Sequence, residues 1–164
     1  MYEKELTELS RAGARYLVIG GVALGLHGYL RATVDLDLLP DLKSENLGII
    51  ADTLGSLGYV PRVPVDPREL KDPRKRQYWH SEKNMEVFTF VNHKNYEDSI
   101  DIMIYPPLDF EQCYQRKHIV HIKDEEVTVA SVEDLMTLKR MSMRAQDRAD
   151  LEVLQRLLER KNER

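Results

Sequence analysis

The seven residues TVDLDLL (33–39) place two carboxylates inside an apolar segment, and this pattern constrains the fold most strongly. Side chains two positions apart lie on the same side of a β-strand. Thr33, Asp35 and Asp37 therefore share one face, and the apolar residues between them share the other. Because burying an unpaired charge is costly, we expect the apolar face to pack on helices and the aspartate face to meet water or a cation.

A second segment, SIDIMIY (99–105), repeats this alternation, with Asp101 between Ser99 and Met103 on one face and isoleucines on the other. If the two strands are neighbours, three carboxylates converge on one polar patch. Like charges repel unless a cation joins them, and Mg²⁺ is bound by carboxylates and phosphates. The alternative is a solvated sheet face with no ligand, although Asp is a poor strand former.

A pair of glycines, Gly20 and Gly21, closes the apolar strand expected at 16–19 and precedes a helical segment. Glycine lets the backbone approach a ligand closely. The N–H groups of such a turn and of the helix behind it favour an anion such as a triphosphate. The alternative is a tight turn without a ligand. Arg31 lies between the two motifs and could contact a phosphate or pair with a nearby acid.

The rest of the chain predicts an α/β (α+β) domain with a mixed sheet, flanking helices and a C-terminal helical pair. Ser44 and Ser131 are expected to cap helices. Residues 63–80, rich in proline and charge, are predicted to form a loop. The remaining expected helices are 3–14, 44–57, 109–116, 131–143 and 147–161, and the remaining strands are 59–63, 85–91 and the two arms of a hairpin turning at 123–126.

The composition predicts one domain over residues 1–164, with an α/β catalytic core at 1–130 and C-terminal helices at 131–164. The hydrophobic fraction of 42% and the charged fraction of 32% are typical of a globular protein with a core. One cysteine excludes an intrachain disulfide, which fits the reducing cytoplasm. The apolar run 16–30 is too short for a membrane span, so we expect no membrane partner.

The net charge of −4 argues against a surface that binds nucleic acid over its whole area. Five basic residues form the one dense basic stretch: Arg68, Lys71, Arg74, Lys75 and Arg76. We favour a solvated loop there. The alternative is a contact surface for a nucleic-acid backbone.

The order strand, Gly20–Gly21, helix and Arg31-x-Thr33-x-Asp35-x-Asp37 resembles the nucleotidyltransferase superfamily of the polymerase-β type. The segments GGVAL and RATVDLD are similar to those of the AbiEii-like toxin group. DLMTLKRMSMRAQDRADLEVL is also similar to the C-terminal motif of that group, a helical lysine followed by R…D-x-x-D-L.

The resemblance implies transfer of a nucleoside monophosphate from an NTP to a hydroxyl of an RNA, a protein or a small molecule. It implies that Asp35 and Asp37 bind Mg²⁺ in a two-metal site. Asp101 would then be a third metal ligand or the base for the acceptor hydroxyl. Gly20 and Gly21 would cradle the phosphates.

The nucleotide side of the implied site contains four more residues: Arg31, Thr33, Lys139 and Asp150. Lys139 would meet the triphosphate and Asp150 would support the site. The alternative for both is a solvated helix face with an ordinary ion pair. The toxin group further implies an antitoxin protein as partner. Two other function classes stay open: an inactive nucleotide-binding or regulatory module, and an interaction domain whose acidic patch binds a basic partner.

Overall fold

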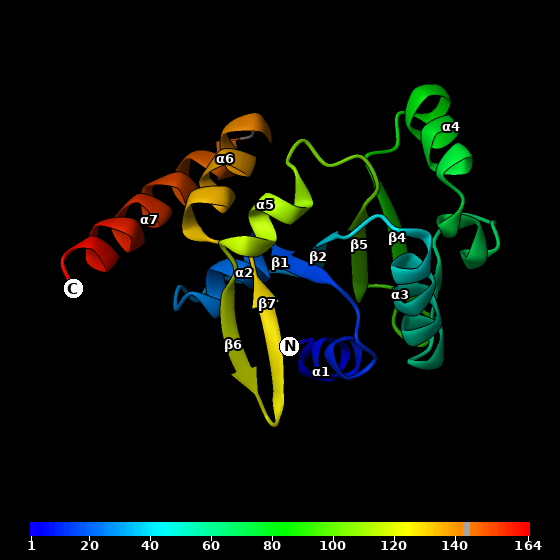
Figure 1. The fold of residues 1–164 in the computed structure, drawn as a ribbon, viewed down its shortest axis with the longest axis horizontal. Coiled ribbons are helices and arrows are strands. Elements are labelled where there is room, and N and C mark those ends of the chain that lie inside the picture. Colours follow the sequence, from blue (N-terminus) through cyan, green and yellow to red (C-terminus); the bar gives the residue numbers. More distant parts are fainter. Residues whose placement is uncertain (143–144) are drawn as a thin grey trace.

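The computed structural model describes residues 1–142 and 145–164, and a single mixed β-sheet organises these residues (Figure 1). Its strand order is β3-β4-β5-β2-β1-β7-β6. The strands are β1 (Tyr16–Ile19), β2 (Asp35–Pro40), β3 (Tyr59–Pro61), β4 (Val87–Asn92), β5 (Ser99–Met103), β6 (His118–Ile122) and β7 (Glu125–Val129).

The pairing of the strands confirms the predicted mixed sheet. β2 lies at the centre, antiparallel to β1 and parallel to β5. The hairpins β4–β5 and β6–β7 are antiparallel, as their turns predict, and β1 runs parallel to β7. The two aspartate-bearing strands are therefore direct neighbours.

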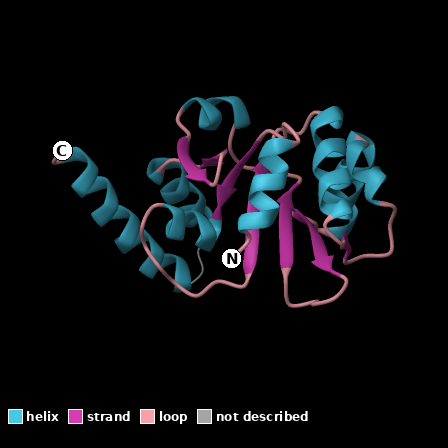
Figure 2. Cartoon of the chain, turned by 90° about the horizontal axis from the view of Figure 1, so that it is seen from below, coloured by secondary structure: helices cyan, strands magenta, loops and turns pink. Residues whose placement is uncertain are grey.

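Helices surround this sheet. They are α1 (Glu3–Arg11), α2 (Gly20–Leu26), α3 (Ser44–Ser56), α4 (Pro73–Lys83), α5 (Phe110–Gln115), α6 (Val132–Ser142) and α7 (Ala145–Asn162), with a 3-10 helix, η1, at Pro67–Lys71. The view of Figure 2 shows helices packed across one face of the strands. Within residues 1–142 and 145–164, every helix is too short or too polar to serve as a membrane span.

The apolar face of the central strands forms the core. Leu36 and Leu38 of β2 and Ile100 and Ile102 of β5 are completely buried, as the alternation of both segments predicts. Burying each of these side chains contributes about 2 kcal/mol. The opposite face of the same strands carries the aspartates. The alternation of polar and apolar residues therefore determines on which side of the sheet they lie.

The C-terminal helices α6 and α7 pack against each other beyond one end of the sheet. The Oγ of Ser131 accepts a hydrogen bond from the backbone N–H of Asp134 at 3.1 Å, which confirms the predicted cap. Leu154 is fully buried, and the other leucines of the predicted apolar face of α7 pack against the core. The predicted end of the first helix, Met143, lies outside the described residues.

The prediction of a loop at 63–80 is wrong, because this segment forms η1 and α4. Asp66 and Asp72 each accept a backbone hydrogen bond as N-caps, and each is followed by a proline at the first helical position. Proline at that position has no N–H to lose and a suitable φ angle. The prolines therefore start helices here.

Two side chains near α4 show how this part of the chain is held. Ser44 is not an N-cap: Lys43 holds that position without a side-chain bond, and the Ser44 hydroxyl donates to the carbonyl of Lys71 at 2.7 Å. Trp79 is buried, with its ring centroid 5.3 Å from that of Phe88. α4 is therefore attached to the sheet by an aromatic contact.

Candidate active site

Asp37 and Asp101 form the centre of the polar face. They are register partners on the parallel strands β2 and β5, and Asp35 is paired in the same way with Ser99. All three carboxylates therefore come from one face of two adjacent strands. This is the juxtaposition that the sequence predicts on the condition that the two strands are neighbours.

Asp101 lies in a partly desolvated position. The hydroxyl of Thr89, on β4, donates to its carboxylate at 2.6 Å. Burial raises the pKa of Asp101, and the charge of Asp35 raises it further, whereas the bond from Thr89 lowers it. A carboxylate whose proton affinity is increased in this way is better suited to accept a proton.

A residue of the neighbouring strand β5 fixes the carboxylate of Asp35. The hydroxyl of the buried Ser99 donates to its carboxylate, and the carbonyl of Ser99 accepts a hydrogen bond from the Tyr2 hydroxyl at 3.1 Å. Because one Asp35 oxygen is bound to Ser99, the carboxylate is fixed in orientation on the rim of the site.

Gly20 and Gly21 are needed for close packing beside the aspartates. A Cβ at Gly20 would lie 2.3 Å from Oδ2 of Asp37, and the φ angle of Gly20 is +69°. A Cβ at Gly21 would lie 2.8 Å from the hydroxyl oxygen of Thr33. The glycines therefore bring the β1–α2 turn into contact with Asp37 and Thr33, the residues of the second motif.

Arg31 forms an ion pair with an acid, and its contact with a phosphate stays a prediction. Its Nη1 contacts both oxygens of Asp150 at 2.5 and 2.6 Å. Lys139 reaches the same carboxylate at 2.9 Å and Asp147 at 3.1 Å. The side chain of Lys139 is 14% exposed and that of Asp150 is 4% exposed, so neither lies on a solvated helix face.

The basic stretch 68–76 is not a uniform cationic surface. Arg76 is buried, and its guanidinium donates to the carbonyls of Leu70 at 2.6 Å and Leu42 at 3.1 Å. Arg68 pairs with Asp66. The solvated-loop interpretation therefore fails for Arg76, which is part of the structure that holds α4.

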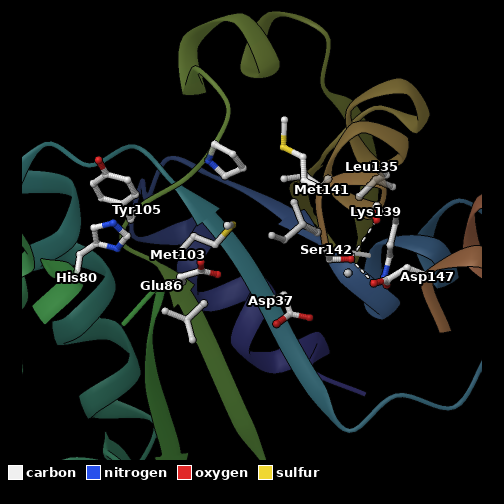
Figure 3. A pocket seen from close by; sticks show the side chains of 15 residues that line it. Asp37, His80, Glu86, Met103, Tyr105, Leu135, Lys139, Met141, Ser142 and Asp147 are labelled. Atoms are coloured by element: carbon white, nitrogen blue, oxygen red, sulfur yellow. Dashed lines mark hydrogen bonds and ion pairs between the residues drawn. The ribbon is translucent and has the colours of Figure 1, made fainter. Parts of the chain in front are cut away.

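A cavity of about 480 Å³ lies over the polar face. In Figure 3, Asp37 stands between two groups of lining residues. Lys139, Ser142 and Asp147 lie on one side, and the Ser142 hydroxyl also donates to Asp147.

The other side of the cavity contains His80, Glu86, Met103 and Tyr105. Sequence reasoning does not identify His80, Glu86, Tyr105, Ser142 or Asp147 as site residues. Only Asp147 carries a usable signal, because it lies three positions before Asp150 and therefore on the same face of a helix.

The carboxylates fit Mg²⁺ by their chemistry. Within the described ranges, no group of three His, Cys, Asp or Glu side chains already has the arrangement of a metal site. Mg²⁺ is, however, commonly held by one or two carboxylates together with substrate phosphates and water. The adjacent pair of Asp37 and Asp101 meets that smaller requirement.

Comparison with known proteins gives structural matches. No family model and no curated protein sequence matches the chain. The lincosamide antibiotic adenylyltransferase LnuA, in a lincomycin-bound crystal structure, has a TM-score of 0.60 and 16% identity over 95% of this chain and 94% of its own. The antibiotic-resistance factor ANT(2'')-Ia has a TM-score of 0.56 and 12% identity over 94% and 84%.

A Thermotoga maritima protein that has been proposed to be a nucleotidyltransferase has a TM-score of 0.55 and 15% identity, over 99% of this chain and 94% of its own. The chain has a nucleotidyltransferase-type fold. This confirms the expected fold class. Membership of the AbiEii-like group stays a prediction from the motifs.

Proposed function

We propose that the chain is a metal-dependent nucleotidyltransferase that moves a nucleoside monophosphate from an NTP to a hydroxyl group. The observation that carries this proposal is the register pairing of Asp37 with Asp101 on the polar face, beside Gly20. The fold supports it, because LnuA, which shares the fold, is named as an adenylyltransferase.

The reaction exchanges one phosphorus–oxygen bond for another. The acceptor oxygen bonds to the α-phosphorus, the bond from that phosphorus to the bridging oxygen breaks, and pyrophosphate leaves. We assign acceptance of the hydroxyl proton to Asp101, because burial raises its pKa and Thr89 orients its carboxylate.

Asp37 and Asp101 would hold Mg²⁺, with Asp35 on the rim of the same face. When bound, Mg²⁺ neutralises charge on the phosphates and makes the acceptor hydroxyl more acidic. The contribution of the chain is to keep the two carboxylates adjacent without backbone movement, since neighbouring strands of one sheet fix their separation.

The triphosphate would lie on the side of Asp37 that contains Lys139. An ammonium group stabilises phosphate mainly as a point charge. Because Lys139 is bound by Asp147 and Asp150, contact with a phosphate requires it to exchange one of these partners. Arg31 would then still neutralise the charge of Asp150. Arg31 and Asp150 would thus act as positioning residues for Lys139.

Calorimetric titration of each NTP, with Mg²⁺ and with EDTA, tests this proposal without knowledge of the acceptor. We expect one NTP to bind in Mg²⁺ and to lose most of its affinity in EDTA. Asp37→Asn should behave in Mg²⁺ as the wild type does in EDTA. Equal affinity in both buffers would overturn the metal-bridged site.

Transfer itself is measured with NTPs labelled at the α-phosphate and a cell extract. Label that moves to a macromolecule or small molecule supports the enzyme, whereas binding without transfer in any fraction supports a regulatory module. The toxin role and an antitoxin partner rest on the sequence motifs alone and are tested by the growth of cells that express the wild type or Asp37→Asn.

A further inference from the structure

Tyr2, at the N-terminal end of α1, reaches the two strands that carry the aspartates. Its side chain is buried, and its hydroxyl lies between two backbone carbonyls. The hydroxyl donates to the carbonyl of Val34, directly before β2, and to that of Ser99, the first residue of β5, at 3.1 Å. Because β2 and β5 are parallel neighbours, this one hydroxyl connects the starts of both strands.

The backbone of Tyr2 is held in an unusual conformation. Its φ angle is +63°, in the left-handed region that bulky residues rarely adopt. Such conformations cost free energy, and they persist where the surrounding structure fixes them, often near functional sites. The carbonyl of Tyr2 accepts a hydrogen bond from the N–H of Leu6 at 3.0 Å, which starts α1. Tyr2 is therefore fixed between α1 on one side and the two strands on the other.

Ser99 connects this arrangement to a carboxylate of the candidate site. Ser99 is 3% exposed, and its hydroxyl donates to Oδ1 of Asp35, its register partner on β2. A hydrogen bond to a charged acceptor is stronger than one between neutral groups. Within residues 1–142 and 145–164, Oδ2 of Asp35 forms no hydrogen bond or ion pair. One oxygen of this carboxylate is therefore fixed, and the other is available to a cation.

Asp35 is the carboxylate whose position depends most on such a bond. It is exposed and follows residues 29–34, which form neither helix nor strand. Asp37, in contrast, packs against the glycine turn, and Asp101 is held by Thr89. Groups that hydrogen-bond to a metal ligand and orient it contribute about 10- to 100-fold to metal affinity.

We infer that Tyr2 is a positioning residue for Asp35 in the metal site. Its hydroxyl fixes the start of β2 against β5, and the hydroxyl of Ser99 then holds Asp35 with one oxygen free for the cation. This inference rests on the proposed transfer function. It extends the residues that determine the affinity for Mg²⁺ from the polar face of the sheet to the start of α1.

The test measures the free Mg²⁺ concentration at which the affinity for an NTP reaches half of its maximum. The NTP is the one that calorimetric titration shows to bind, and the titration is repeated at a series of Mg²⁺ concentrations. Tyr2→Phe keeps the buried ring and removes the hydroxyl alone. We expect this variant to raise the required Mg²⁺ concentration roughly two- to tenfold, the effect of one lost hydrogen bond.

Tyr59→Phe is the matched control. Tyr59 is also buried, and its hydroxyl also reaches α1, but it donates to Glu5 at 3.0 Å and not to a residue of β2 or β5. Each variant removes one buried hydroxyl, so both should lose a similar amount of stability in denaturant unfolding. The Mg²⁺ requirement should change in Tyr2→Phe and stay at the wild-type value in Tyr59→Phe.

Two further variants test the route through Asp35. Ser99→Ala should raise the Mg²⁺ requirement at least as much as Tyr2→Phe does, roughly tenfold, and it provides the same test if Tyr2→Phe does not fold. Asp35→Ala should raise the requirement as well. In the Asp35→Ala background, neither Tyr2→Phe nor Ser99→Ala should raise it further, because the carboxylate that they position is gone.

Four results would overturn the inference. They are an unchanged Mg²⁺ requirement in Tyr2→Phe or Ser99→Ala, an unchanged requirement in Asp35→Ala, an equal rise in Tyr59→Phe, and an effect of Tyr2→Phe that persists in the Asp35→Ala background. If the wild type binds the NTP equally well without Mg²⁺, the proposed function fails, and this inference fails with it. The wild-type titration therefore distinguishes the two failures.

Discussion

Asp37 and Asp101 face each other as register partners on two parallel strands that are far apart in the sequence. The hairpin β4–β5 brings β5 next to β2, and the alternation of each strand turns both carboxylates to the same side. Burial and the charge of Asp35 both disfavour the charged form of Asp101, and a cation bound at this face would offset that cost.

The first prediction is that Asp37→Asn lowers transfer activity by about 10²–10³-fold, the range typical for loss of one electrostatic group. The protein should melt no lower than the wild type without metal, because one of two adjacent negative charges is gone. Scanning calorimetry with and without Mg²⁺ and NTP provides the measurement. A variant that retains wild-type activity would remove Asp37 from the site.

The second prediction concerns pH and Asp101. Because burial raises the pKa of Asp101 in the folded state above its ordinary value, the folded protein binds this proton more tightly than the unfolded chain. The contribution of Asp101 to stability is then favourable below the ordinary pKa and is lost as the pH rises through the folded-state pKa.

Asp101→Asn should therefore be more stable than the wild type at pH 7, and the difference should disappear at low pH. Denaturant unfolding at a series of pH values measures this. Activity should fall by about 10²–10⁴-fold if Asp101 accepts the proton of the acceptor. Because Asp101 is also a proposed Mg²⁺ ligand, the affinity for the NTP in Mg²⁺ should fall too, but by less than the activity does. A stability difference that grows toward low pH would contradict the assigned environment.

The third prediction uses two glycines of one helix. Gly20→Ala places a Cβ 2.3 Å from the Asp37 carboxylate at a φ angle of +69°, and should destabilise the protein by more than about 1 kcal/mol and reduce activity. At Gly25 a Cβ meets nothing within 4 Å. Gly25→Ala should stabilise α2 by about 0.5–1 kcal/mol. If both variants behave alike, the close approach of Gly20 to Asp37 is not what requires the glycine.

The sequence predicts the strands that carry the aspartates because polar and apolar residues alternate in them with a period of two. One face of each strand is buried and the other is solvated, so odd and even positions carry different kinds of residue. It also predicts the glycine turn, the cap at Ser131 and the apolar face of α7. These features are local: each depends on residues within one turn or one strand.

The sequence does not reveal α4 or the side of the cavity that contains His80, Glu86 and Tyr105. In 63–80, each Asp-Pro pair reads as a loop signal, although the same pair also serves as an N-cap followed by a first helical residue. His80, Glu86 and Tyr105 line one cavity because contacts between distant elements, such as that of Trp79 with Phe88, attach α4 to the sheet. No spacing along the chain encodes such a contact between distant elements.

The fourth prediction separates the two arginines of α4. Arg76→Ala removes the donors of two backbone carbonyls and should cost about 1–3 kcal/mol of stability. Arg74 is exposed, so Arg74→Ala should change stability by less than about 0.5 kcal/mol. Chemical denaturation of both variants measures the difference. If Arg74→Ala instead weakened the binding of a polynucleotide and reduced its salt dependence, the basic stretch would be a nucleic-acid contact surface.

The fifth prediction concerns Lys139 and the carboxylates that it joins. Lys139→Ala removes the ammonium shared by Asp147 and Asp150, which are 6% and 4% exposed. Loss of one partner from a buried ion pair costs about 3–5 kcal/mol, so the variant should melt clearly lower than the wild type. It should also bind the NTP more weakly in Mg²⁺, because the point charge for the phosphates is lost.

The double variant Lys139→Ala/Asp147→Asn separates these two effects. Removing the charge of Asp147 together with that of Lys139 should restore part of the stability, whereas the affinity for the NTP should stay low. Thermal unfolding and calorimetric titration of the wild type and both variants give the two quantities independently. If nucleotide affinity recovered along with stability, Lys139 would act only by holding α6 and α7 together, and the triphosphate would be bound by other groups.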